Sequence, residues 1–150
     1  MEKFKYNFFI AGRTRNKENI LNLCKIFDEL NITYYCFLKN DESHKEAGLD
    51  ANDEHLADTF EALSLDDPRV RTIFEHDLKG LNESENLLLV LPAGKSAHIE
   101  SGIAFGKNKK CYAIGEYDVT DSLYLIFDKI FSDENELKSF LVKYKEEQCH

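Results

Sequence analysis

The segment 91–107 holds the residues best suited to chemistry in this chain. Its sequence, LPAGKSAHIESGIAFGK, follows an apolar run at 87–91 and precedes another at 111–114. That order is typical of a buried strand, a tight turn, a short helix and a further strand. A helix that starts after such a turn directs unpaired N–H groups beyond the end of the sheet, where an anion or ligand can bind. Glu100 falls in the first or second turn of this helix, so we predict that its carboxylate lies at the rim of a ligand pocket.

Asp77 is a second acidic residue in an unusual position. The apolar face of the expected helix 68–81 is formed by Val70, Ile73, Phe74 and Leu81. Asp77 lies on that same face, and a carboxylate there costs free energy unless it is hydrogen-bonded or used. Asp77 is therefore either a structural residue that bonds a backbone amide or reaches solvent, or a partner of Glu100. Glu100 also has a structural alternative, since the helix dipole alone stabilises an acidic residue near a helix start.

Strands and helices that alternate along the chain must position these residues. We expect strands at 6–11, 33–38, 87–91, 110–114 and 129–131, and helices at 16–30, 68–81, 97–106, 120–127 and 133–145. Strand–helix–strand units form parallel pairs with right-handed crossovers. The sequence therefore predicts a doubly wound α/β fold, a flavodoxin-like sandwich with a four- to five-stranded, mostly parallel sheet. No linker or repeat divides the chain, so 1–150 is expected to be a single domain.

Ligands of such sheets bind beyond the carboxyl ends of the strands. This places 12–16 and 92–100 on one rim, with Asp77 near them and Ser96 as the expected N-cap. Gly12, Arg13, Thr14 and Arg15 precede a helix, so they could cradle a phosphate or carboxylate. The alternative is that both arginines are simply solvated.

The charge is concentrated in one segment. The chain has a net charge of −9, and 41–67 contains ten acidic residues and one lysine, while the rest of the chain is balanced. A nucleic-acid polymer is therefore not an expected partner. Apolar residues in 41–67 follow a helical stripe, which predicts an acidic helical insertion whose charged side is a solvated face or a partner surface. They are Leu49, Leu56, Phe60 and Leu63.

Several classes of protein are not supported. No apolar run reaches the ~20 residues of a membrane helix, so a membrane is not an expected partner and the expected location is the cytoplasm. The four cysteines lack C-x-x-C spacing, which argues against a disulfide scaffold or zinc ribbon. The sequence at 94–96 lacks the first glycine of a P-loop, that at 98–100 lacks the cysteines of a zinc deaminase, and 102–106 lacks the Rossmann glycines. We expect no metal and no organic cofactor.

Nearly the whole chain resembles the nucleoside 2-deoxyribosyltransferase superfamily, which includes the deoxynucleoside 5′-monophosphate N-glycosidases. The resemblance rests on FFIAG at 8–12, DLKGLNESENLLLVLP at 77–92, SAHIESGIAFGKNKKCYAI at 96–114 and the tail at 121–141. It implies that Glu100 attacks the anomeric carbon of a (deoxy)ribosyl group and forms a covalent glycosyl-enzyme. It also implies that Asp77 handles protons on the base or orients the sugar, and that 13–15 lies where a 5′-phosphate is held.

Two positions depart from the pattern of this superfamily. Gly94 stands where the transferases have a second sugar-binding Asp, and Phe9 replaces an aromatic hydroxyl in the first strand. Both changes remove hydrogen bonds to the sugar. Lys95, Ser96 and His98 are then candidates for replacement contacts, either with a phosphate or with a different leaving group.

The sequence thus predicts an enzyme that cleaves or transfers the N-glycosidic bond of a nucleoside or nucleotide. One alternative is a non-catalytic nucleotide-binding or interaction protein that kept the fold. Another is a glycohydrolase of an NAD-type dinucleotide. The resemblance also implies a homo-oligomer, a dimer or larger, in which a neighbouring subunit completes the pocket.

Overall fold

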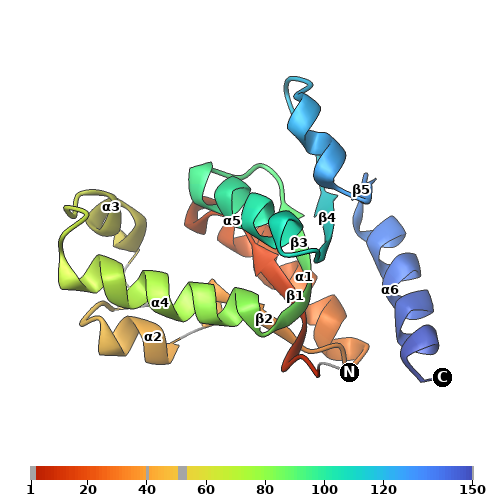
Figure 1. Ribbon diagram of the computed structural model, residues 1–150, viewed down its shortest axis with the longest axis horizontal. Helices are drawn as coiled ribbons and strands as arrows, with labels where there is room; N and C mark the ends of the chain where they lie inside the picture. Colours follow the sequence, from red (N-terminus) through yellow and green to blue (C-terminus); the bar gives the residue numbers. More distant parts are fainter. Residues whose placement is uncertain (1–2, 40, 51–53, 150) are drawn as a thin grey trace.

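Five parallel strands form the sheet at the centre of the molecule (Figure 1), a computed structural model that describes residues 3–39, 41–50 and 54–149. The strands are β1 (Tyr6–Ala11), β2 (Tyr34–Cys36), β3 (Ser84–Val90), β4 (Lys110–Ile114) and β5 (Lys129–Phe131). Their order is β2-β1-β3-β4-β5, and every neighbouring pair is parallel. This is the strand order of flavodoxin-like sheets. The predicted α/β fold is confirmed, with five strands.

Helices cover both faces of this sheet. The α-helices are α1 (Lys17–Glu29), α2 (Asp41–Glu46), α3 (Leu56–Glu61), α4 (Pro68–Asn82), α5 (Lys95–Gly106) and α6 (Glu134–Gln148). Three short 3₁₀ helices, η1 (Thr14–Asn16), η2 (Phe37–Lys39) and η3 (Ser122–Ile126), lie in connections. Figure 1 shows α2 and α3 beside the N-terminal half of α4, away from α6.

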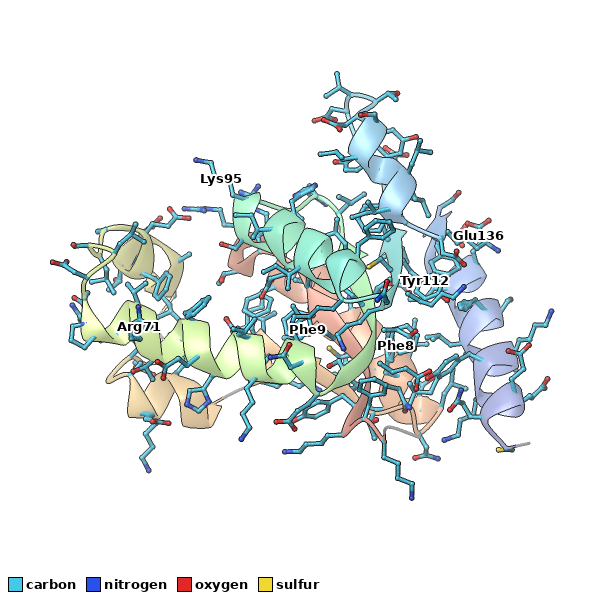
Figure 2. All side chains as sticks on the ribbon, viewed as in Figure 1. Phe8, Phe9, Arg71, Lys95, Tyr112 and Glu136 are labelled. Carbon is cyan, nitrogen blue, oxygen red and sulfur yellow. The ribbon has the colours of Figure 1, made fainter. Side chains whose placement is uncertain are left out.

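Alternating side chains of the strands build two cores. In β1, Phe8 and Ile10 belong to the core shared with α1 and α6, whereas Phe9 and Ala11 belong to the core shared with α4 and α5. Strands covered on both faces read as nearly continuous apolar runs, which explains the run at 87–91. Figure 2 shows Phe8 and Phe9 in the middle of the molecule. The carboxyl end of the sheet is thereby held rigidly from both sides.

Some elements differ from the expectations. The segment 41–67 contains two short helices, α2 and α3, instead of one stripe, and 51–53 lies outside the described residues. Helix α5 begins at Lys95, with Gly94 and not Ser96 as its N-cap. Phe74 is 52% exposed, so it is not on the buried face of α4.

Within the described residues, no helix is both long and apolar enough to span a membrane.

Candidate active site

A cavity of about 600 Å³ lies at the carboxyl ends of β1 and β3. The connections that follow these two strands form one side, and α3, α4 and η2 contribute the others. This volume is within the usual range of small-molecule sites. The cavity brings together the two segments that the sequence placed on one rim. From 12–16 it takes Gly12, Arg13, Thr14 and Arg15, and from 92–100 it takes Gly94, Lys95, Ser96, Ala97 and Glu100.

Glu100 reaches this cavity from the second turn of α5. Ala97, Ser101 and Ala104 are buried on the side of the helix that faces the sheet, which fixes the direction of its neighbours. Within the described residues, the Glu100 carboxyl has no hydrogen bond or ion pair. Burial and, to a smaller extent, the nearby negative charge of Asp77 together raise its pKa to about 8. A carboxyl group of this kind is largely neutral at pH 7.

Asp77 lines the same cavity from the C-terminal half of α4. Burial raises the pKa of its carboxyl, while a hydrogen bond donated by the Tyr35 hydroxyl to Oδ1, 2.8 Å long, acts in the opposite direction. The two carboxyl groups singled out in the sequence therefore lie in one site. The two carboxyl groups interact electrostatically, but only Asp77 accepts a hydrogen bond from a described residue.

Tyr35 is a site residue that sequence reasoning missed. Its ring stacks on Phe9, with centroids 5.2 Å apart and planes 9° apart. A Cβ at Gly80 would come within 2.6 Å of the Tyr35 ring, so only glycine lets α4 approach this ring closely. The sequence feature that could have indicated a large side chain against α4 is Gly80, a glycine inside an otherwise regular helix, three residues after Asp77. Tyr35 does not itself line the cavity, but its hydroxyl group bonds Asp77, which does, whereas Phe9 in β1 has no hydroxyl group.

Arg13 and Lys95 give the cavity positive charge, and Thr14 and Ser96 give it hydroxyl groups. None of these four side chains forms a hydrogen bond or ion pair within the described residues. Figure 2 shows Lys95 at the first turn of α5, with its side chain directed away from the sheet. Free donors beside a helix N-terminus suit an anionic group.

Arg15 differs from Arg13 because its guanidinium is already engaged. It donates to both carboxylate oxygens of Glu61, at 2.8 and 3.1 Å, and to Oδ1 of Asp58 at 2.9 Å. These bonds raise the pKa of Arg15 and lower that of Glu61, so both groups stay charged. The acidic segment therefore has a cationic partner inside the protein itself.

Apolar side chains form a large part of the cavity wall. Three of them come from the acidic segment, and two come from η2 and α4. They are Leu49, Leu56, Phe60, Phe37 and Ile73. Three of the four apolar residues singled out in 41–67 thus face the candidate site, and Leu63 does not line it.

Two residues that the sequence assigned to the pocket, His98 and Phe9, do not line the cavity. The His98 ring lies 2.7 Å from the Gly94 carbonyl oxygen and 3.1 Å from the Tyr124 hydroxyl. Residues two apart on a helix point in different directions, so His98 faces η3 while Glu100 faces the cavity. Phe9 is 1% exposed and lies beneath Tyr35.

A second cavity, of about 650 Å³, lies along the edge strand β2. Among the described residues of its lining, Asp28 is the single carboxyl group, and it accepts a hydrogen bond from Tyr34 and pairs with Lys39. Elsewhere in the described part of the chain, no cluster of three or more His, Cys, Asp or Glu residues is arranged to hold a metal ion. The cavity with Glu100 and Asp77 is therefore the better candidate for catalysis.

Comparisons with known proteins point to the same fold. No protein-family model matches the chain, and no curated protein does. A solved structure described as the 2-deoxyribosyltransferase of the psychrotolerant bacterium Bacillus psychrosaccharolyticus matches with a TM-score of 0.60 and 14% sequence identity. The match covers 87% of this chain and 89% of that chain. This protein therefore has the fold of a 2-deoxyribosyltransferase.

Proposed function

We propose that this protein cleaves the N-glycosidic bond of a (deoxy)nucleoside or nucleotide and transfers the sugar to water or to a second base. The observation that carries the proposal is the pair of carboxyl groups, Glu100 and Asp77, in one cavity. The fold shared with a 2-deoxyribosyltransferase supports it, as does the presence of both cationic and apolar walls in the same cavity.

The two carboxyl groups divide the chemistry. A Glu100 oxygen forms a bond to the anomeric carbon as the bond from that carbon to the base breaks, and the electron pair of the broken bond goes to the base nitrogen. Asp77, in its acid form, donates a proton to the departing base. Water or a second base then attacks the anomeric carbon, which releases Glu100 as a carboxylate and returns a proton to Asp77.

The environments of the two groups fit these roles. Burial raises the pKa of Asp77, which favours the acid form that protonates the base. With a pKa of about 8, roughly one tenth of Glu100 is carboxylate at pH 7. Because no protein donor within the described residues bonds that carboxylate, it is a strong nucleophile when it forms. The reactive state holds one proton between the two carboxyl groups, with Glu100 as the carboxylate and Asp77 as the acid, so the rate falls above about pH 8, where the pair loses that proton.

We favour a nucleotide over a nucleoside as the substrate. Within the described residues, Arg13 and Lys95 are cations with no hydrogen bond or ion pair, although the charge of Glu61 lies near Arg13, and Thr14 and Ser96 add hydroxyl donors beside the start of α5. A 5′-phosphate satisfies all four groups. A nucleoside leaves both cations without a partner.

The test is release of free base from deoxynucleosides, deoxynucleotides and NAD, followed by chromatography. We expect release from at least one deoxynucleotide, and none from Glu100→Gln. Glu75→Gln is the matched control, since Glu75 is an exposed carboxylate on α4 that does not line the cavity. Release from NAD alone would favour the dinucleotide glycohydrolase. Binding of nucleotides without release of base from any of them would favour the non-catalytic alternative.

We also propose that the protein self-associates. Several large apolar side chains are exposed on α5 and η3, among them Ile99, Phe105, Leu123 and Leu125. Exposed apolar residues that gather on neighbouring elements are typical of interaction surfaces. Analytical ultracentrifugation of the wild type and of Leu125→Glu tests this, with a dimer or larger species expected for the wild type and a shift toward monomer for the variant.

A further inference from the structure

We propose that α3 is the wall against which the base of the substrate packs, and that Arg15 is a positioning residue that holds this wall in place. The proposal rests on the proposed function for the choice of a nucleotide as the ligand. It assigns a role to the acidic segment, and it gives Arg15 a task other than contact with phosphate.

The tertiary link between α3 and the rest of the protein runs through Arg15. A helix of six residues is not stable alone in water, so contacts with other elements must hold α3. Within the described residues, Arg15 makes all the side-chain hydrogen bonds that join α3 to the remainder of the chain, through Asp58 and Glu61. These two acceptors are three positions apart, so they lie on adjacent turns of one side of the helix.

The geometry of Arg15 fixes orientation as well as distance. One nitrogen, Nη1, bonds Glu61, and the other, Nη2, bonds both Glu61 and Asp58. A planar guanidinium that contacts two carboxylates defines how α3 is rotated. Lysine has a single ammonium nitrogen on a flexible chain and cannot reproduce this arrangement.

The rotation of α3 decides which side chains enter the cavity. Leu56 and Phe60, four positions apart, lie on one side of the helix and line the cavity together with Ala57. Asp58 and Thr59 remain exposed and do not line it. Of the two carboxylates that hold Arg15, Asp58 thus lies on the outer side of this wall, whereas Glu61 lines the cavity beside the apolar side chains.

An aromatic ring is the ligand group that suits this wall. Phe60, Phe37 and Ile73 offer apolar surface with no hydrogen-bonding group, in the cavity that also contains Glu100 and Asp77. Stacking of a base on an aromatic side chain contributes to affinity whichever base is present. The wall thus recognises the face of the base, and the affinity for the base depends on Phe60.

The experiment compares two ligands that differ only in the base. The dissociation constants of 2′-deoxyadenosine 5′-monophosphate and of deoxyribose 5-phosphate are measured by calorimetry with the full-length Glu100→Gln protein, which retains the cavity but does not turn over. We expect Phe60→Ala and Arg15→Gln to weaken the nucleotide about tenfold and deoxyribose 5-phosphate less than twofold. Arg71→Gln is the control, because Arg71 is an exposed arginine on α4 that does not line the cavity.

A second variant separates positioning from direct contact. Asp58→Asn combined with Glu61→Gln keeps Arg15 but removes its partners, and it should weaken the nucleotide as much as Arg15→Gln does. Stronger binding of deoxyribose 5-phosphate by this variant would mean that the freed Arg15 holds phosphate, and the proposal would be overturned. Equal losses for both ligands in Arg15→Gln would overturn it too.

The remaining outcomes are equally decisive. Unchanged nucleotide affinity in Phe60→Ala, or no nucleotide binding by the Glu100→Gln protein, contradicts the proposal. If Phe60→Ala does not fold, as judged by circular dichroism, Phe60→Leu replaces it and should show a smaller loss confined to the nucleotide. The binding experiment does not measure base release. A wild-type protein that binds the nucleotide but releases no base would therefore count against the proposed function alone.

Discussion

Replacing Glu100 by Gln should stabilise the protein, and increasingly so as the pH rises. Burial raises the pKa of the Glu100 carboxyl from 4.5 to about 8. Between these two values the folded protein holds a proton that the unfolded chain has lost, so the stability of the wild type falls as the pH rises. Gln has no proton to lose, and the variant therefore avoids this loss.

The size of the effect follows from the pKa. Each pKa unit corresponds to about 1.4 kcal/mol, which gives a ceiling of about 5 kcal/mol for Glu100 above pH 8. Water in the cavity and relaxation of the surrounding side chains reduce the cost of the charge, so we expect about 2–4 kcal/mol. Below pH 4.5 the carboxyl is neutral in both states, and the wild type and the variant should be nearly equal in stability.

Urea unfolding at pH 5, 6, 7 and 8 measures this difference. The free energy of unfolding of Glu100→Gln minus that of the wild type should grow across this series. Glu75→Gln, on the exposed side of α4, should differ from the wild type by less than about 0.5 kcal/mol at every pH. A gap of the same size for Glu100→Gln at pH 5 and pH 8 would refute the argument, because the carboxyl would then have an ordinary pKa.

Three further predictions concern the same site. Gly80→Ala should destabilise the protein by about 1–3 kcal/mol in urea unfolding despite the better helix propensity of alanine, because its Cβ would overlap the Tyr35 ring; equal or higher stability would show that the ring moves freely. Tyr35→Phe should lower the free energy of unfolding by about 1 kcal/mol and raise the pKa of Asp77, which carbon NMR of that carboxyl measures. An unchanged pKa would mean that the hydrogen bond to Oδ1 is absent in solution. The kcat/KM for base release should fall about tenfold per pH unit above about pH 8, where the Glu100–Asp77 pair loses the proton that the base must receive, whereas a constant kcat/KM from pH 7 to 10 would exclude a proton shared by this pair from the reaction.

The parts of the fold that the sequence could predict are those governed by local pattern. Strand β3 and helix α4 have long apolar periodicities, and Pro68 marks the start of α4 after the capping residue Asp67. The nearness of Asp77 to Glu100 followed from topology, because the carboxyl ends of parallel strands meet at one edge. Local pattern and topology were therefore sufficient to find the two carboxyl groups.

The parts that could not be predicted depend on contacts between distant segments. Arg15 was expected to meet a substrate anion, but its partners lie 43 and 46 residues further along the chain, and their place depends on how α3 packs. His98 was assigned to the pocket as a replacement for lost contacts with the sugar, although its ring faces Tyr124. Tyr35 lies 42 residues from Asp77. None of these pairings leaves a periodic signal.

The unequal surroundings of the two carboxyl groups have a mechanistic consequence. Tyr35 gives Asp77 one hydrogen bond, whereas within the described residues Glu100 has none, so charge on Glu100 is the less well stabilised in the free protein. On the proposed mechanism, positive charge develops on the sugar as the base departs. The positive charge on the sugar lies beside the Glu100 carboxylate and stabilises it by electrostatic attraction. No group of the free protein within the described residues stabilises the carboxylate in this way. The interaction is then much stronger in the transition state than in the ground state, which is the condition for it to accelerate the chemical step.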